Sequence, residues 1–277
     1  MVGEAPAASL PSNRGVLPSG FNNLDAALRT GGWPRGSLAL LDAPRGAGAT
    51  TLAIRSLAAA QAAGGIVAWI DATGCLDAAT LARQGIELDW LLVVRPASVG
   101  EAVELAGWLA RSDLVDATVL DLGEQLAPRD EAPIASSTTL MLGLDRLGKL
   151  LVRGRSVALL LIGERLRSAI GRVAAVRVAL EREAWLAVGR DLVGQRVRAT
   201  VARHRWALAG ASATLDLWFT EGRRIDALLP LLAIPEPASP LAPAVPEPFA
   251  GPLPLAVPLP LAVPELEERP ALRVLSA

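Results

Sequence analysis

Apolar runs typical of buried strands alternate with helix-like runs over the first 160 residues of the chain. In the segment 99–112, Ala102, Leu105 and Leu109 recur at helical spacing and share one face. Strands are expected near 37–42, 65–71, 91–95, 116–121 and 156–162, and helices near 50–63, 77–85, 99–112 and 136–153. Strands alternating with helices of this length predict an α/β fold with a mainly parallel sheet and helices on both faces.

The pattern changes after residue 173, where strand-like runs follow one another directly. Runs at 174–186, 195–206 and 213–219 predict an antiparallel hairpin extension of the sheet.

Proline content divides the chain into three predicted parts. Residues 1–16 are expected to be a flexible N-terminal arm, and residues 17–229 a folded core. Residues 230–277 hold 13 of the 21 prolines, a density that helices and central strands do not tolerate. This part is predicted to be a disordered or polyproline-like tail. Its leucines and valines leave two interpretations open, a spacer or a docking segment near residues 261–274.

Composition excludes several classes of protein. The net charge of −1 gives no global indication of nucleic-acid binding, so any such indication must be local. The single cysteine, Cys75, cannot form an internal disulfide and suits a reducing compartment. No uninterrupted apolar run is long enough to span a membrane, and residues 1–6 do not resemble the start of a signal peptide. We expect a cytoplasmic protein without a membrane partner.

The most informative segment lies between the first long strand and the helix that follows it. It begins at Ala43 and ends at Thr50, where a phosphate-binding loop would read G-x-x-x-x-G-K-[ST]. The second glycine and the hydroxyl are in register, but alanine replaces the first glycine and the lysine. Arg45 has two interpretations, a phosphate contact or a solvated loop arginine. The predicted degenerate nucleotide-binding loop comprises Ala43, Arg45, Gly46, Gly48, Ala49, Thr50 and Thr51, together with Asp121.

The surrounding sequence resembles the RecA recombinase family. The resemblance rests on Leu17–Leu28 followed by Gly31–Gly36, and on Ile66–Ala72, which matches a strand ending in Asp-Ala-Glu. It continues through the later strand-like runs to Gly222. It implies a RecA-like P-loop NTPase core.

The resemblance also indicates which parts of the ATP chemistry have changed. Asp121 matches the aspartate that helps to hold Mg²⁺, although it could equally cap the next turn. Thr73 stands where the family has its water-activating glutamate, and threonine cannot act as a general base at neutral pH. Glu164 stands where the family has a γ-phosphate-sensing glutamine. With Ala49, these changes predict a protein that is not an enzyme and binds no cofactor or metal.

Positive charge is concentrated between residues 153 and 205, where 12 arginines face four acidic residues. Such a segment suits a phosphate backbone, although solvated hairpin arginines would give the same pattern. The candidate DNA-binding residues are Arg165, Arg167, Arg172 and Arg177. Arg203 and Arg205 match two lysines that contact the neighbouring subunit in RecA filaments, so they are candidates for a partner interface.

The pattern of losses is most similar to ImuA, the RecA-like accessory group of bacterial mutagenesis cassettes. It implies a non-catalytic, nucleoid-associated adaptor in DNA-damage-induced translesion synthesis. Its implied partner is ImuB, an inactive Y-family polymerase homologue, with RecA and non-specific DNA as further candidates. The core is expected to keep the groove that receives a neighbour's N-terminal arm in RecA. A SulA-type cell-division inhibitor that binds FtsZ and a regulator of RecA filaments remain alternatives.

Overall fold

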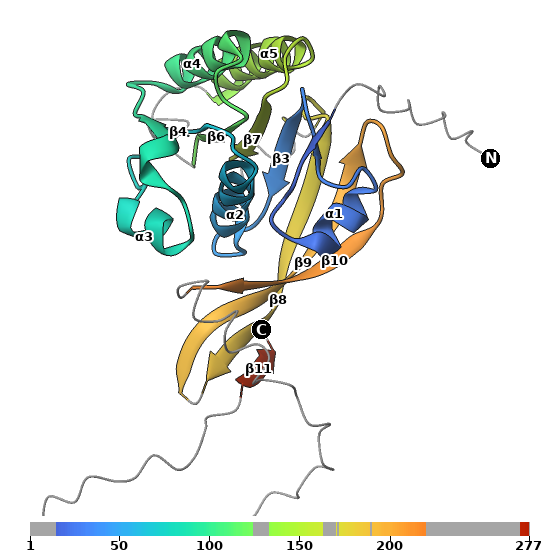
Figure 1. Cartoon of the computed structure of the whole chain (residues 1–277). Helices are drawn as coiled ribbons and strands as arrows, with labels where there is room; N and C mark the ends of the chain where they lie inside the picture. Colours follow the sequence, from blue (N-terminus) through green and yellow to red (C-terminus); the bar gives the residue numbers. More distant parts are fainter. Residues whose placement is uncertain are drawn as a thin grey trace, which may run out of the picture.

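The computed structural model describes residues 15–123, 133–162, 170, 172–188, 190–219 and 272–276 (Figure 1). The helices are α1 Asn22–Leu28, α2 Ala49–Ala62, α3 Ala78–Arg83, α4 Val99–Ser112 and α5 Pro133–Leu151, with a 3₁₀ turn at Leu88–Trp90. A small sheet pairs β1 Val16–Leu17 with β2 Trp33–Pro34. The main sheet is formed by β3 Leu38–Asp42, β4 Val67–Asp71, β5 Leu91–Val94, β6 Ala117–Asp121, β7 Val157–Leu161, β8 Val176–Val188, β9 Asp191–His204, β10 Ser212–Trp218 and β11 Leu272–Ser276.

The main sheet has the strand order β10-β9-β8-β3-β7-β6-β4-β5, and β11 also pairs with β8. All pairs from β8 through β3 to β5 are parallel. Parallel strands buried on both faces are continuously apolar, which explains why β3, β4 and β7 are apolar runs. The expected α/β architecture with helices on both faces is confirmed.

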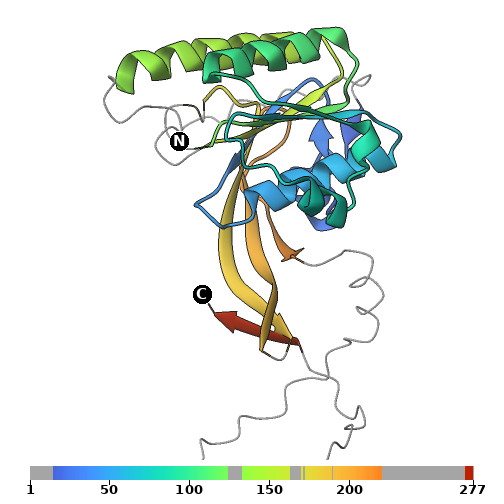
Figure 2. The same cartoon turned by 90° about the vertical axis from the view of Figure 1, so that its left-hand side faces the viewer.

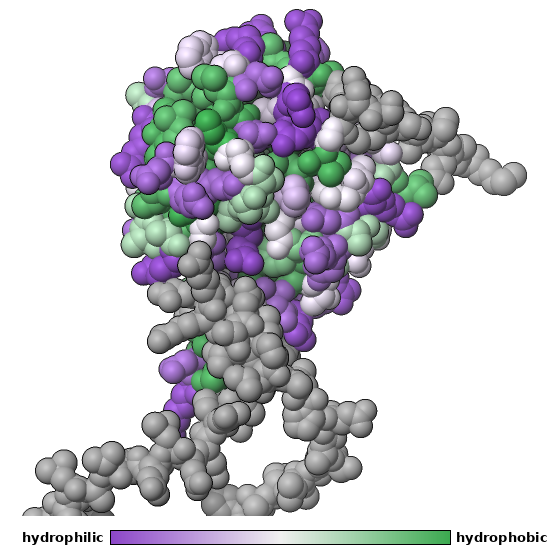
Figure 3. Space-filling model, in the orientation of Figure 1, coloured by the Kyte–Doolittle hydropathy of each residue, from purple (hydrophilic) through white to green (hydrophobic). Residues whose placement is uncertain are grey.

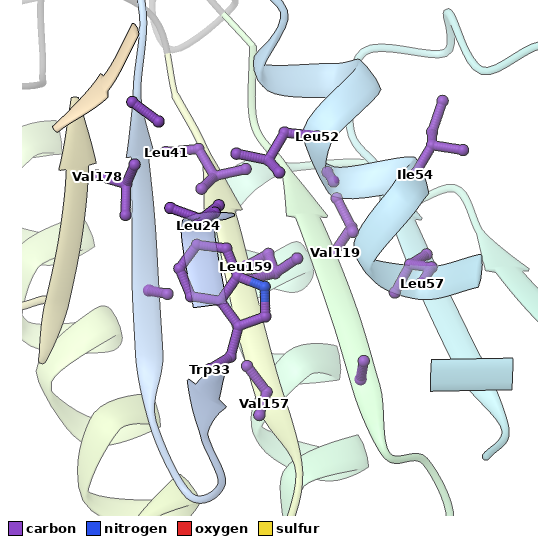
Figure 4. Packing of buried hydrophobic residues seen from close by; sticks show 14 of the residues in the cluster. Leu24, Trp33, Leu41, Leu52, Ile54, Leu57, Val119, Val157, Leu159 and Val178 are labelled. Atoms are coloured by element: carbon purple, nitrogen blue, oxygen red, sulfur yellow. The ribbon is translucent and has the colours of Figure 1, made fainter. Parts of the chain in front are cut away.

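Alternating side chains of the strands build two cores. Leu41 and Leu159 pack on one face against α1 and α2 (Figure 4). Leu40 and Leu160 point to the other face, where they pack against α4 and α5. Because side chains alternate along a strand, this two-sided burial fixes the register of the central strands.

Hydrogen bonds at two helix starts follow directly from the sequence. The Ser98 hydroxyl accepts a bond from the Glu101 amide, and the Glu101 carboxylate accepts one from the Ala97 amide. Asp77 similarly accepts bonds from the Ala79 and Thr80 amides at the start of α3. Both arrangements satisfy amides that the first turn of a helix leaves unpaired.

The segment before β3 is attached to α2 by a buried hydrogen-bond chain. The Trp33 indole donates to the Ser56 hydroxyl at 3.0 Å, and this hydroxyl donates to the Ser19 carbonyl at 2.9 Å. Gly32 adopts a φ of +144°, and a Cβ there would collide with the Leu17 carbonyl. These contacts hold the lead-in segment against the helix that follows the loop.

The hairpin strands β8, β9 and β10 form the predicted antiparallel extension. The far parts of β8 and β9 project beyond the helix-covered part of the sheet (Figure 2). At the end of the chain, β11 pairs with residues 184–188 of β8. The prediction of a tail without regular structure is therefore wrong for residues 272–276, because these residues complete the edge of the projecting hairpin. The rest of this tail, from 230 to 271, and residues 1–14 lie outside the described residues.

Among the described residues, no helix has both the length and the apolar character needed to cross a membrane.

Candidate functional site

The loop between β3 and α2 has a backbone that requires glycine. The Ala47 amide donates to the Pro44 carbonyl at 3.1 Å, and Gly48 precedes α2 with a φ of +89°. A Cβ on Gly48 would collide with the Leu217 side chain of β10. The hairpin extension therefore packs directly against the start of α2.

A cavity of about 670 Å³ opens beside this loop. All eight residues that the sequence assigned to the degenerate loop site line it, namely Ala43, Arg45, Gly46, Gly48, Ala49, Thr50, Thr51 and Asp121. The structure therefore brings the predicted set together. Ala49 is the first residue of α2 and is half-buried. Because alanine is uncharged, the position where the resemblance places a lysine carries no positive charge.

Two carboxylates end neighbouring strands at the edge of this cavity. Asp71 of β4 and Asp121 of β6 are direct register partners. The Thr73 hydroxyl donates to Asp71 at 2.7 Å, and the Gly74 amide donates to the same oxygen at 2.8 Å. Asp71 therefore organises the turn after β4, and Thr73 is bound to a carboxylate.

The environments of the two carboxylates shift their pKa values in opposite directions. Burial tends to raise the pKa of Asp71, but the Thr73 hydroxyl and several amides hold it below its usual value. Burial, together with the charge of Asp71, raises the pKa of Asp121 to about 6, although the Gly123 amide opposes the shift. Asp121 thus carries its charge at neutral pH in an unfavourable place.

Metal ligands are sparse in the described part of the chain. No group of three or more His, Cys, Asp or Glu side chains gathers there in a way that could hold a metal ion.

Of the four candidate DNA-binding arginines, Arg172 and Arg177 lie among the described residues. Arg177 donates through Nε to Asp42 at 2.8 Å, and a second guanidinium nitrogen contacts the same carboxylate. Arg177 is therefore engaged with Asp42 at the β3–β8 junction, and its assignment as a DNA-binding residue stays a prediction. Arg172 is exposed, as a DNA contact requires. Arg165 and Arg167, like Glu164, lie outside the described residues.

Other arginines of the hairpins are also engaged. Arg196 forms a bidentate pair with Asp216, at 2.7 and 2.9 Å, and Arg198 bonds Glu183 at 2.6 Å. These pairs neutralise part of the positive charge that the sequence places on the extension.

The two partner-interface candidates lie at the end of β9 and are exposed. A guanidinium nitrogen of Arg203 donates to the Arg172 carbonyl, and the Arg205 guanidinium lies 5.7 Å from the centre of the Trp206 ring. Between them, His204 is buried, which lowers its pKa to about 4.

Sequence reasoning missed the residues that cover the loop from the hairpin extension. Trp185, Gln195 and Phe219 line the cavity, although each stands more than 100 residues after the loop. Their positions depend on the long pairing of β8 with β9 and β10, which no local motif announces.

Known proteins resemble both the sequence and the fold. Residues 9–145 match the RecA N-terminal domain. Protein RecA of Nocardioides sp. is 33% identical over 230 residues, and protein RecA of Mycolicibacterium smegmatis is 32% identical over 231 residues. Each match covers 75% of this chain. The chain spans about two thirds of the length of these relatives, 65% and 66% respectively.

The fold also matches a solved structure, that of the RadB recombinase. The TM-score is 0.56 at 18% identity, over 74% of this chain and 98% of that one. The chain is therefore similar to RecA over three quarters of its length and has a RecA-like fold.

Proposed function

We propose that this chain is a non-catalytic RecA-like adaptor in DNA-damage-induced mutagenesis and translesion synthesis. In this proposal it resembles ImuA, acts at the nucleoid in the cytoplasm, and binds an ImuB-type inactive polymerase homologue. RecA and non-specific DNA are further partners. The observation that carries the proposal is the chemistry of the loop cavity, where Ala49 and Thr73 occupy the two positions on which ATP hydrolysis depends.

Two features of these residues support the proposed absence of catalysis. Ala49 brings no cation to a transferring phosphate, whose charge such a cation would stabilise. The Thr73 hydroxyl donates a hydrogen bond to Asp71, which fixes its orientation. A hydroxyl is not basic enough to accept a proton from water at neutral pH. In this proposal the loop keeps its backbone conformation but does not support ATP hydrolysis.

The partner surface that we propose is the edge of the sheet at β5. Among the described residues β5 pairs only with β4, which leaves its other edge open. Trp90, Leu92 and Val93 are exposed there, by 56%, 44% and 41%. Figure 3 shows hydrophobic residues gathered above this region, over the part of the molecule where α4 lies. An open apolar edge suits a partner segment that adds a strand.

The proposed function is tested by complementation: each form of the protein is expressed in cells that lack it, and the damage-induced mutation frequency is measured. The wild-type protein should restore mutagenesis. The Asp121→Asn variant, which lacks the carboxylate that a catalytic metal would need, should restore it too. Leu92→Lys should not restore it, because a charge on the β5 edge opposes strand addition. The matched control is Leu208→Lys, an exposed leucine between β9 and β10. Loss of mutagenesis with Asp121→Asn at normal protein levels would indicate a catalytic role instead.

A further inference from the structure

An apolar groove of about 1300 Å³ runs between α4 and α5. Trp108 of α4 and Leu142 of α5 line it and are exposed by 60% and 57%. Figure 3 shows hydrophobic residues gathered over this part of the molecule. Large apolar side chains that are exposed together in a groove indicate a surface that another protein segment covers.

The exposed residues of both helices follow the spacing of helix–helix packing. On α4, the exposed residues that line the groove recur at intervals of three and four, at Glu101, Glu104, Trp108 and Arg111. On α5, the same intervals separate Thr139, Leu142 and Arg146. One helix packs along another with this repeat, so the groove suits further helices rather than an extended peptide.

Two glycines bring α4 and α5 close together and show how the helices are oriented. A Cβ on Gly143 would lie 3.1 Å from the Val103 side chain, and a Cβ on Gly107 would lie 3.4 Å from the Leu150 side chain. Because Val103 precedes Gly107 and Gly143 precedes Leu150, the two helices run in the same direction. Both amino ends therefore lie toward one end of the groove.

Charge is divided between the two ends of the α4 side of this groove. Glu101 and Glu104 lie in its amino half, Arg111 lies in the last turn, and Trp108 stands between Glu104 and Arg111. Within the described part of the chain, neither Glu104 nor Arg111 forms an ion pair. The groove therefore has an acidic end and a basic end, and both retain charges that a partner could neutralise.

We propose that this groove is the contact surface between two copies of the chain, with the α4–α5 pairs packed antiparallel. A two-fold axis near Trp108 places Glu104 of one protomer opposite Arg111 of its partner, and the symmetry forms the reverse pair as well. The amino ends of the helices in one copy then lie beside the carboxyl ends in the other, which the helix dipoles favour. The charge pattern of the groove is thus complementary to its own copy.

This interface goes beyond the adaptor proposal, which uses the open strand edge at β5. Helices form the contact rather than an added strand. A two-fold contact uses the same patch on both protomers, so the assembly closes at two copies and does not extend into a filament. Self-association is measured on the purified chain alone, so its result does not depend on the adaptor role.

The first test is the mass of the full chain in solution, from sedimentation equilibrium over a range of concentrations. The wild-type chain should be a dimer with a dissociation constant in the micromolar range. Trp108→Asp should weaken the dimer by about tenfold or more, because it places a charge at the centre of the interface. The matched control is Leu208→Asp, at an exposed leucine between β9 and β10, which should leave the dimer unchanged.

A wild-type chain that stays monomeric up to about 100 μM would overturn the proposal. If Trp108→Asp then also lost binding to the polymerase homologue, the groove would belong to that partner instead.

Charge reversal tests whether the partner is a second copy. Glu104→Arg makes both members of the proposed pair basic, and Arg111→Glu makes both acidic, so each variant alone should dimerise about tenfold more weakly or worse. An equimolar mixture of the two variants should recover dimers, because every pair then joins opposite charges. Both side chains are exposed in the single chain, so circular dichroism should show that each variant folds. A mixture that dimerises no better than the separate variants would overturn the proposal.

Discussion

Single residues at the end of β4 and β6 decide the chemistry of the loop cavity. Asp71 has a hydroxyl and several amides to stabilise its charge, whereas Asp121 has mainly the Gly123 amide. The two carboxylates are register partners, so the charge of Asp71, which several hydrogen bonds stabilise, makes ionisation of Asp121 less favourable. Asp121 is therefore a source of instability at neutral pH rather than a source of stability.

The first prediction concerns the pH dependence of stability. The pKa of Asp121 in the folded state, about 6, is above the ordinary value of an aspartate, 3.8, so the folded state holds this proton more tightly. Its contribution to stability is present below pH 4 and is lost as pH rises through 6. Asp121→Asn should therefore raise the free energy of unfolding above pH 6, by up to about 3 kcal/mol, and should change little at pH 4. Denaturant titrations at both pH values measure this, and an equal effect at the two would contradict it.

The second prediction concerns ATP. Because Ala49 removes the charge expected on the β- and γ-phosphates, the chain should bind ATP weakly, with a dissociation constant well above about 1 μM. Ala49→Lys alone should not give hydrolysis, since Thr73 provides no base. Titration with a fluorescent nucleotide and a phosphate-release assay measure the two claims. A wild-type dissociation constant near 1 μM, or turnover by Ala49→Lys, would show that the loop is not degenerate in function.

At the scale of elements, periodicity predicted the parallel core well because each strand there is a continuous apolar run. Helix α4 spans the 99–112 segment that the spacing of its apolar residues predicted. Helix α1 was not predicted, because its seven residues make only about two turns, too few for a periodic apolar pattern to stand out. The pairing of β11 with β8 was not predicted either, because a five-residue strand after a proline-rich stretch has no local signal.

The candidate site shows the same division between local and distant information. The loop residues and Asp121 were found because they occupy fixed positions relative to strand ends. Trp185, Gln195 and Phe219 were missed as cavity residues because only the pairing of the long hairpin strands brings them there.

The third prediction follows from the junction of β3 with β8. Arg177 pairs with the buried Asp42, so Arg177→Ala removes a charge-assisted contact from this carboxylate. We expect the free energy of unfolding to fall by about 1–3 kcal/mol. The matched control is Arg198→Ala, whose pair with Glu183 is exposed and should matter by less than about 1 kcal/mol. Equal losses in the two variants by urea denaturation would contradict this role for Arg177.

The fourth prediction concerns the DNA-binding candidates other than Arg177, which pairs with Asp42. Replacing Arg165, Arg167 and Arg172 together by alanine should weaken non-specific DNA binding. Each lost phosphate contact should reduce the log–log salt slope by about 0.9 on duplex DNA and about 0.7 on single strands. Fluorescence anisotropy over a range of salt concentrations measures the slope. Affinity and slope that stay at the wild-type values would indicate solvated arginines.

At the scale of the whole molecule, the two ends of the main sheet differ. The hairpin extension lies at one end and covers the loop cavity, and β11 completes part of its edge. The other end is β5, whose apolar residues have no covering strand among the described residues. The proposed division of roles follows from this asymmetry, because partner binding at β5 needs no change at the cavity.

The most direct test of the adaptor proposal is calorimetric titration of the purified chain with ImuB, RecA and FtsZ. We predict that ImuB binds, that Leu92→Lys weakens this binding at least tenfold, and that Leu208→Lys leaves it unchanged. A chain that ends at residue 229 should bind as tightly as the full chain, because β11 lies on β8, away from β5. Wild-type affinity in Leu92→Lys, binding that requires the residues after 229, or binding to FtsZ alone would contradict the account.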